Sequence, residues 1–89
     1  MLPMAKKEGV LILSPGWGDD YRLDIRYPDG TYYGGLHCGE TIEVFRDVET
    51  DTVRAAWVPA RVEADVDGEW YLAGMYKPGE IPSGLMVRK

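Results

Sequence analysis

The stretch YRLDIRYPDG, residues 21–30, decides the fold class of this chain. Apolar or aromatic side chains occupy its odd positions, namely Tyr21, Leu23, Ile25 and Tyr27, and charged residues fill the even positions between them. This period of two predicts a strand with one face in a core and the other in solvent. The turn PDG follows, because proline presets φ and glycine accepts positive φ. Residues 31–33 are therefore expected to return as a hairpin partner.

Comparable short segments lie on both sides of this strand, and we expect further strands at residues 9–13, 41–46, 54–63, 69–75 and 85–88. Turns such as DVDG at residues 65–68 separate them at intervals of about 8–12 residues, which is typical of small sandwiches and barrels. The sequence thus predicts an all-β antiparallel barrel of about six short strands, with one short helical turn near residues 81–84. Pro59 lies inside an expected strand and indicates an edge position or a bulge, because it cannot donate to a ladder.

One stretch leaves an alternative open, because residues 40–58 contain neither glycine nor proline. A short helix at residues 45–57 would fit that composition. The threonines and valines of the stretch favour a hairpin with a long loop instead.

Length and charge restrict the function further. A chain of 89 residues has room for one compact domain, which we place at residues 9–89 after a flexible extension at residues 1–8. Its net charge of −5 disfavours direct binding to nucleic acid, because there is no excess of bases to neutralise phosphates. Cys38 is the single cysteine, which is typical of a reducing cytoplasm. The run at residues 10–13 is too short for a signal peptide or a membrane span.

Two motifs in the C-terminal part of the sequence are similar to those of known families. DGEWYLAG at residues 67–74 and GEIPSGLMV at residues 79–87 resemble the second half of an SH3 domain. The wider pattern GLHCGETIEVF … WVPARVE … MYKPGEIPSG is similar to a small bacterial family of unknown function, often found on Gram-positive mobile elements. The resemblance implies an SH3-like barrel, with Trp70 and Pro82 at the positions of the groove tryptophan and proline. Leu85 stands where that groove has a tyrosine, so a proline-rich ligand is not implied.

The sequence offers no set of residues for catalysis. His37 and Cys38 are adjacent, so on a strand they would point to opposite faces, and we interpret Cys38 as a small buried hydrophobic residue. One histidine and one cysteine do not make a zinc site. The motif GWG at residues 16–18 has no helix after it to bind a phosphate. We therefore expect no enzyme activity, no metal and no cofactor.

Two functions remain open. The first is a cytoplasmic module that binds another protein, as a monomer or weak homodimer and without contact to nucleic acid or membrane. Its expected contact residues are aromatic or lie in loops: Trp17, Trp70, Tyr76, Pro82, Asp65 and Asp67. The alternative is a small acidic inhibitor that mimics DNA and blocks a nucleic-acid-binding protein of the host. The carboxylates of Glu63, Asp65, Asp67 and Glu69, with Asp47, Glu49 and Asp51, would then stand in for phosphates.

Overall fold

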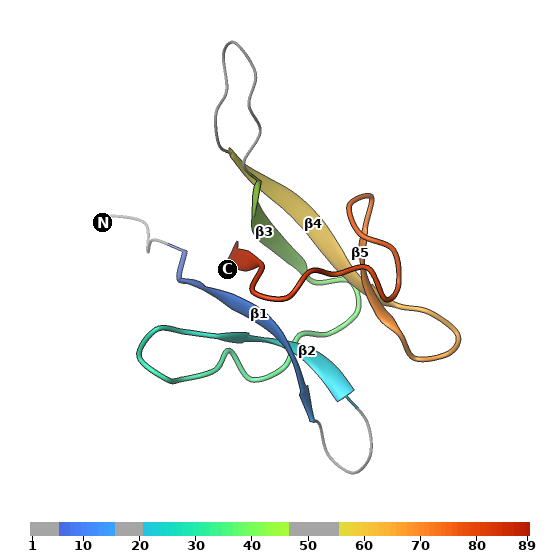
Figure 1. The fold of residues 1–89 in the computed structure, drawn as a ribbon, viewed down its shortest axis with the longest axis horizontal. Coiled ribbons are helices and arrows are strands. Elements are labelled where there is room, and N and C mark those ends of the chain that lie inside the picture. The colour runs from blue at the N-terminus through green and yellow to red at the C-terminus, as the bar shows by residue number, and fades with distance from the viewer. Residues whose placement is uncertain (1–5, 16–20, 47–55) are drawn as a thin grey trace.

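The computed structural model describes residues 6–15, 21–46 and 56–89, and within them the protein is all-β (Figure 1). Six antiparallel strands form one sheet in the order β2-β1-β6-β3-β4-β5. Their bounds are β1 Glu8–Pro15, β2 Tyr21–Arg26, β3 Thr41–Arg46, β4 Ala56–Ala64, β5 Trp70–Ala73 and β6 Met86–Arg88. The all-β prediction is confirmed. The helical turn expected near residues 81–84 is wrong, because Ser83 and Gly84 form a plain turn and the described residues contain no helix.

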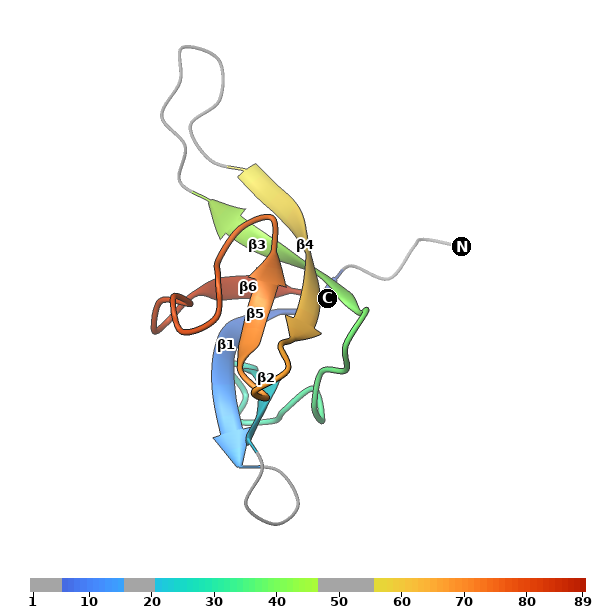
Figure 2. The ribbon, with the colours of Figure 1, turned by 90° about the vertical axis from the view of Figure 1, so that its right-hand side faces the viewer.

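The sheet curls around one core but does not close into a continuous ladder (Figure 2). β2 and β5 remain as edge strands and do not pair with each other, so the fold resembles a barrel but is not a closed one. Every strand contributes to the core, whose buried hydrophobic residues are Leu11, Leu23, Ile25, Tyr27, Leu36, Ile42, Val44, Ala60, Val62, Leu72 and Val87.

Gly9 lies where the backbones of β1 and β2 approach each other closely inside this curl. An added Cβ at Gly9 would lie 2.6 Å from the carbonyl oxygen of Arg26 and 2.7 Å from a methyl carbon of Ile25. Glycine is therefore required here for space, and it lets β1 lie close against the end of β2.

The burial of the β2 residues follows the predicted alternation at most positions and departs from it at two. Leu23, Ile25 and Tyr27 are buried as expected, whereas Tyr21 at the start of the strand is 57% exposed. Asp24 occupies an even, outward position and yet is only 7% exposed. The next segment of chain covers it, because the amides of Gly34 and Gly35 donate to Asp24 Oδ1 at 3.0 and 2.9 Å.

That covering segment follows the outer edge of β2. The Tyr33 amide donates to the Ile25 carbonyl at 2.9 Å, and the Leu36 amide donates to the Leu23 carbonyl at 2.8 Å. The expected hairpin partner at residues 31–33 is thus present as an irregular segment with a single bridge between Tyr32 and Arg26.

The hairpin of β3 and β4 confirms the strand interpretation of its two arms. Phe45 pairs with Trp57 across the ladder, and their rings meet edge to face at 5.4 Å. A helix over residues 45–57 is therefore excluded at both of its ends, while residues 47–55 lie outside the described residues. Pro59 confirms its expected edge position: β5 pairs only with Arg61–Ala64, which leaves Pro59 with β3 on one side alone.

The first described residues already belong to the fold. β1 begins at Glu8, and the Lys7 amide donates to the Lys89 carbonyl at 3.1 Å, with the reverse bond of the same length. No helix in the described part of the chain is long and apolar enough to cross a membrane.

Candidate functional site

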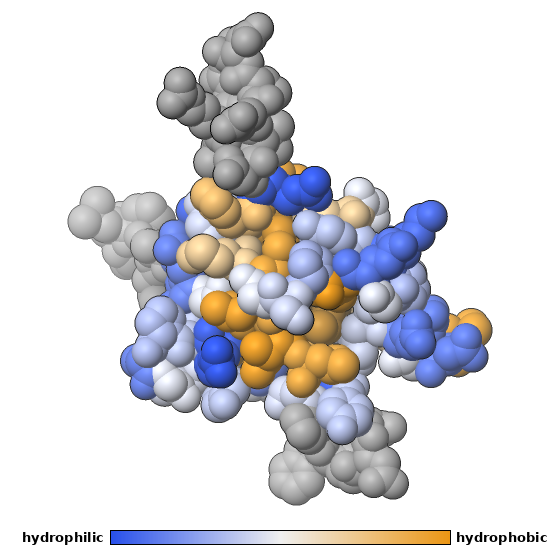
Figure 3. Space-filling view, in the orientation of Figure 1, coloured by the Kyte–Doolittle hydropathy of each residue, from blue (hydrophilic) through white to orange (hydrophobic). Residues whose placement is uncertain are grey.

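A groove of about 690 Å³ lies beside β1 and is the candidate functional site. Its size falls in the usual range for ligand sites, which is about 300–1,000 Å³. Figure 3 shows hydrophobic side chains gathered on this face, below the chain segment that leads into β6. We call it the β1 groove. Its lining residues are Val10, Leu11, Ile12, Leu13, Tyr21, Leu23, Arg26, Gly68, Glu69, Trp70, Gly79, Ile81, Pro82, Ser83 and Gly84.

The walls of the β1 groove include apolar side chains that the fold leaves open to solvent. Leu13 and Tyr21 are each 57% exposed, although their positions follow the inward-facing phase of β1 and β2. They lie where the β1–β2 ladder runs beyond the end of β6, so within the described residues no further strand pairs with β1 beside them. Exposed large apolar groups that are grouped in a concavity indicate an interaction site.

Trp70 forms the end wall of the β1 groove and also holds the curled sheet together. Its indole Nε1 donates to the Tyr21 carbonyl at 2.8 Å, which links edge strand β5 to edge strand β2. The Arg22 guanidinium lies 5.5 Å from the centre of the indole ring. Because the indole N–H is already bonded, Trp70 offers the groove ring surface and no donor.

Pro82 also lines the β1 groove, within the segment between β5 and β6. The turns of this segment contain Gly79 and Gly84, whose φ values are 78° and 77°. Its far end is fixed to β1, because the Leu11 amide donates to the Leu85 carbonyl at 2.9 Å. The structure thus brings together Trp70 and Pro82, two of the residues that the sequence singled out.

The other expected contact residues lie elsewhere. Tyr76 pairs with Leu72 at the outer edge of β5, and the Arg46 guanidinium lies 5.6 Å from its ring centre. Asp65 Oδ1 accepts the amides of Asp67 and Glu69, both at 2.9 Å, so this carboxylate stabilises the turn. Asp67 is exposed, and neither aspartate lines the β1 groove. Trp17 lies outside the described residues.

Sequence reasoning missed the contribution of β1 and the start of β2. Ile12 and Leu13 belong to a continuous apolar run and Tyr21 to an alternating one, and both patterns predict burial. A signal was available for Tyr21 alone, since it is the first position of its strand and follows a loop.

Charged groups lie at the two ends of the β1 groove. Arg26 pairs with Val10 in the ladder at one end, and Glu69 stands next to Trp70 at the other. Within the described residues, neither Arg26 nor Glu69 takes part in an ion pair. No group of three or more histidine, cysteine or acidic side chains that would suit a metal occurs in the same part of the chain.

A family model described as "Domain of unknown function (DUF5348)" matches residues 18–89. This chain belongs to the DUF5348 family. A crystal structure of a protein from Ruminococcus gnavus aligns with a TM-score of 0.63 and 37% sequence identity, over 93% of this chain and 100% of that one. Comparison with curated proteins gives no match. The expected membership of a family of unknown function is confirmed, whereas the mobile-element origin and the SH3 likeness stay predictions.

The His37–Cys38 pair of this DUF5348 chain corrects one expectation. Cys38 is exposed in a turn beside Gly39, so its interpretation as a buried hydrophobic residue is wrong. The reason is local: Leu36 enters the core, and the chain then turns outward before β3 begins at Thr41. His37 Nδ1 lies 3.2 Å from Arg22 Nη1.

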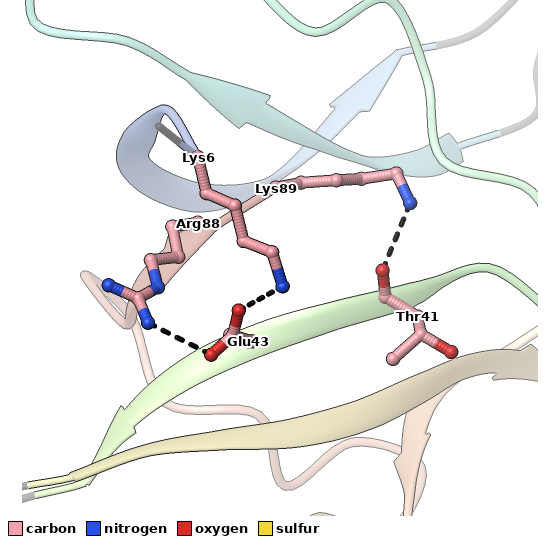
Figure 4. A network of polar contacts seen from close by, with 5 residues as sticks. All are labelled: Lys6, Thr41, Glu43, Arg88 and Lys89. Carbon is pink, nitrogen blue, oxygen red and sulfur yellow. Dashed lines mark hydrogen bonds and ion pairs between the residues drawn. The ribbon is translucent and has the colours of Figure 1, made fainter. Parts of the chain in front are cut away.

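A cluster of polar contacts around Glu43, shown in Figure 4, has a structural role in the DUF5348 fold. Glu43 on β3 accepts hydrogen bonds from Lys6 and, at 3.0 Å, from Arg88 on β6. The Lys6 and Arg88 hydrogen bonds hold the pKa of the Glu43 carboxyl below its ordinary value of 4.5. Lys89 Nζ donates to the Thr41 carbonyl at 2.9 Å. These contacts fasten both ends of the described chain to β3.

Proposed function

We propose that this DUF5348 chain is a non-catalytic module that binds a segment of a partner protein in the β1 groove. The observation that supports the proposal is the grouping of Leu13, Tyr21, Trp70 and Pro82 around one cavity of about 690 Å³. Tyrosine and tryptophan are the residue types in which binding energy concentrates at interfaces, at roughly 2 kcal/mol or more per residue.

The dimensions of the β1 groove favour a segment over a folded domain. The β1 residues that line the groove run from Val10 to Leu13, which at about 3.3 Å per residue span about 10 Å. A standard interface between folded proteins needs about 800 Å² on each side, considerably more than a cavity of this length presents. A short stretch of polypeptide is the occupant that fits.

The test uses matched pairs of exposed residues. We expect Tyr21→Ala and Leu13→Ser to remove a partner that the wild-type chain captures from a lysate of the cells that express it. Tyr32→Ala and Val66→Ser are the controls, because Tyr32 is 55% exposed, Val66 is fully exposed, and both lie outside the groove. The captured protein is then purified, and its affinity for each variant is measured by titration calorimetry.

A loss of affinity of tenfold or more in both groove variants, with unchanged controls, supports the proposal. Circular dichroism confirms that each variant folds. If the groove variants bind as tightly as the wild type, the β1 groove is not the binding site and the proposal fails.

The acidic residues give no comparable support to the DNA-mimic alternative. The Glu63 carboxylate pairs with the Arg61 guanidinium at 2.9 Å, and the Asp65 carboxylate stabilises its own turn. Residues 47, 49 and 51 lie outside the described part of the chain. We therefore carry forward the protein-binding function alone.

A further inference from the structure

We infer that the partner segment binds as an added β-strand along the open edge of β1, with alternating apolar side chains and a lysine or arginine beside Glu69. This inference rests on the proposed function and specifies the chemistry of the occupant. It is carried by the hydrogen-bonding pattern of β1, by the faces that line the β1 groove, and by the charge at one end.

β1 is longer than the strand that covers its second edge. β2 pairs with β1 from Val10 to Pro15, whereas β6 pairs with it only from Glu8 to Val10. The bond from the Leu11 amide to the Leu85 carbonyl is the last backbone contact on this side within the described residues. Beyond Leu11 the edge of β1 borders the groove instead of a strand.

The phase of the ladder shows which backbone groups point into the β1 groove. The amides of Lys7 and Leu11 both donate toward the β6 side of β1. In an antiparallel sheet the direction of these groups alternates, so residues in the same odd phase point the same way. Leu13 therefore directs its N–H and C=O into the groove, where an extended chain would pair with them.

Three other strand edges in the described part of the chain are less suited to strand addition. The amides of Tyr33 and Leu36 bond to the outer edge of β2, and Tyr76 exchanges backbone bonds with Leu72 at the outer edge of β5. The unpaired half of β4 contains Pro59, which lacks a donor and discourages strand addition. On β1, Pro15 lies in the same phase as Leu13 and lacks a donor too, so the free stretch offers the N–H and C=O of Leu13. The free stretch of β1 lies instead against apolar walls, and an edge of this kind favours pairing.

The side-chain preference follows from the faces that meet at the β1 groove. Leu13, Tyr21 and Trp70 all occupy inward-facing positions of their strands. An added strand would point every second side chain toward these three residues and the others toward solvent. Apolar residues at alternate positions therefore match the groove.

Charge complementarity fixes one more feature of the segment. Glu69 lines the groove next to Trp70, and its Oε2 atom lies 3.9 Å from where a Cβ of Gly79 would stand. Asp67 is exposed two residues before Glu69, Glu80 is exposed next to Gly79, and the whole chain carries a net charge of −5. A cationic residue of the segment meets this acidic end favourably.

The test uses a displayed library of random nine-residue peptides, selected for binding to the full chain. We expect the selected peptides to have apolar residues at alternate positions and lysine or arginine at one end. N-methylation of every second amide in a selected peptide should abolish binding, while methylation of the intervening amides should be tolerated. Such a period of two distinguishes a paired strand from a peptide held by its side chains alone.

Protein variants complete the test. Leu13→Pro removes the N–H that points into the groove, and Leu13→Ala is its matched control because it shortens the side chain but keeps the donor. We expect Leu13→Pro to bind a selected peptide roughly 5- to 10-fold more weakly than Leu13→Ala, which is the usual effect of one hydrogen bond. Glu69→Gln should reduce the preference for cationic peptides.

The outcomes separate this inference from the proposed function. If selected peptides respond to Tyr21→Ala but tolerate N-methylation at all positions, or are rich in proline, strand addition is wrong and the groove function stands. If no selected peptide responds to Tyr21→Ala or Leu13→Ala, the groove function fails as well.

Discussion

Asp24 provides the strongest single test of how this fold is held together. Its carboxylate is buried, and Oδ1 accepts the amides of Ile25, Gly34 and Gly35 at 2.8, 3.0 and 2.9 Å. The two glycine amides belong to the segment that carries Leu36 into the core. Asp24→Ala would leave these partly buried donors without their acceptor.

The expected loss can be worked from those contacts. Leaving a buried donor unsatisfied costs about 1–3 kcal/mol, and the partial exposure of both glycine amides places each near the lower end. We therefore expect Asp24→Ala to lower the free energy of unfolding by about 2–4 kcal/mol, a large share of the ~5–15 kcal/mol that a domain has. Asp24→Asn keeps an oxygen acceptor without the charge and should lose about half as much.

Urea unfolding followed by tryptophan fluorescence measures this loss. With a slope of about 1–1.5 kcal/mol/M, the midpoint of Asp24→Ala should fall by about 2 M. Asp67→Ala is the matched control, because Asp67 is an exposed aspartate whose carboxylate makes no hydrogen bond or ion pair within the described residues. A loss of less than about 1 kcal/mol, or one no larger than in Asp67→Ala, would refute the reasoning.

Three further predictions follow from the core, the polar cluster and the turn before β3. Gly9→Ala should destabilise by about 1–3 kcal/mol or prevent folding, because its Cβ would overlap the Arg26 carbonyl; thermal melting measures this. Because the folded-state pKa of Glu43 is lowered, its contribution is present above the ordinary value of 4.5 and is lost as the pH falls through the folded value. Acid titration should therefore destabilise the wild type more than Glu43→Gln. Cys38→Ser should change stability by less than about 0.5 kcal/mol, since Cys38 is exposed; a larger loss would restore a packing role.

Strand positions were largely predictable because they depend on local features. The alternation at residues 21–27 and the turn residues at 28–30 and 65–68 act between neighbours in the chain. β3 was predicted at its observed bounds, Thr41–Arg46. The two exceptions have different causes. Asp24 is buried by a segment ten residues further along the chain, which begins at Gly34, whereas Cys38 is turned outward by a local effect, because Leu36 enters the core just before it.

The sequence by itself determined the all-β class and the approximate positions of the strands, because residue types and their spacing express these properties. It left Pro59 at an edge position or a bulge, and it singled out Trp70 and Pro82 only as candidate contact residues. Tertiary structure alone decided that Trp70 bonds to Tyr21 across the two edges of the sheet, and that Leu13 stays exposed. Both follow from strand order and from the point where β6 ends beside β1. An inward-facing leucine has the same local pattern whether or not another strand covers it, so only the assembled sheet shows that the β1 groove is open.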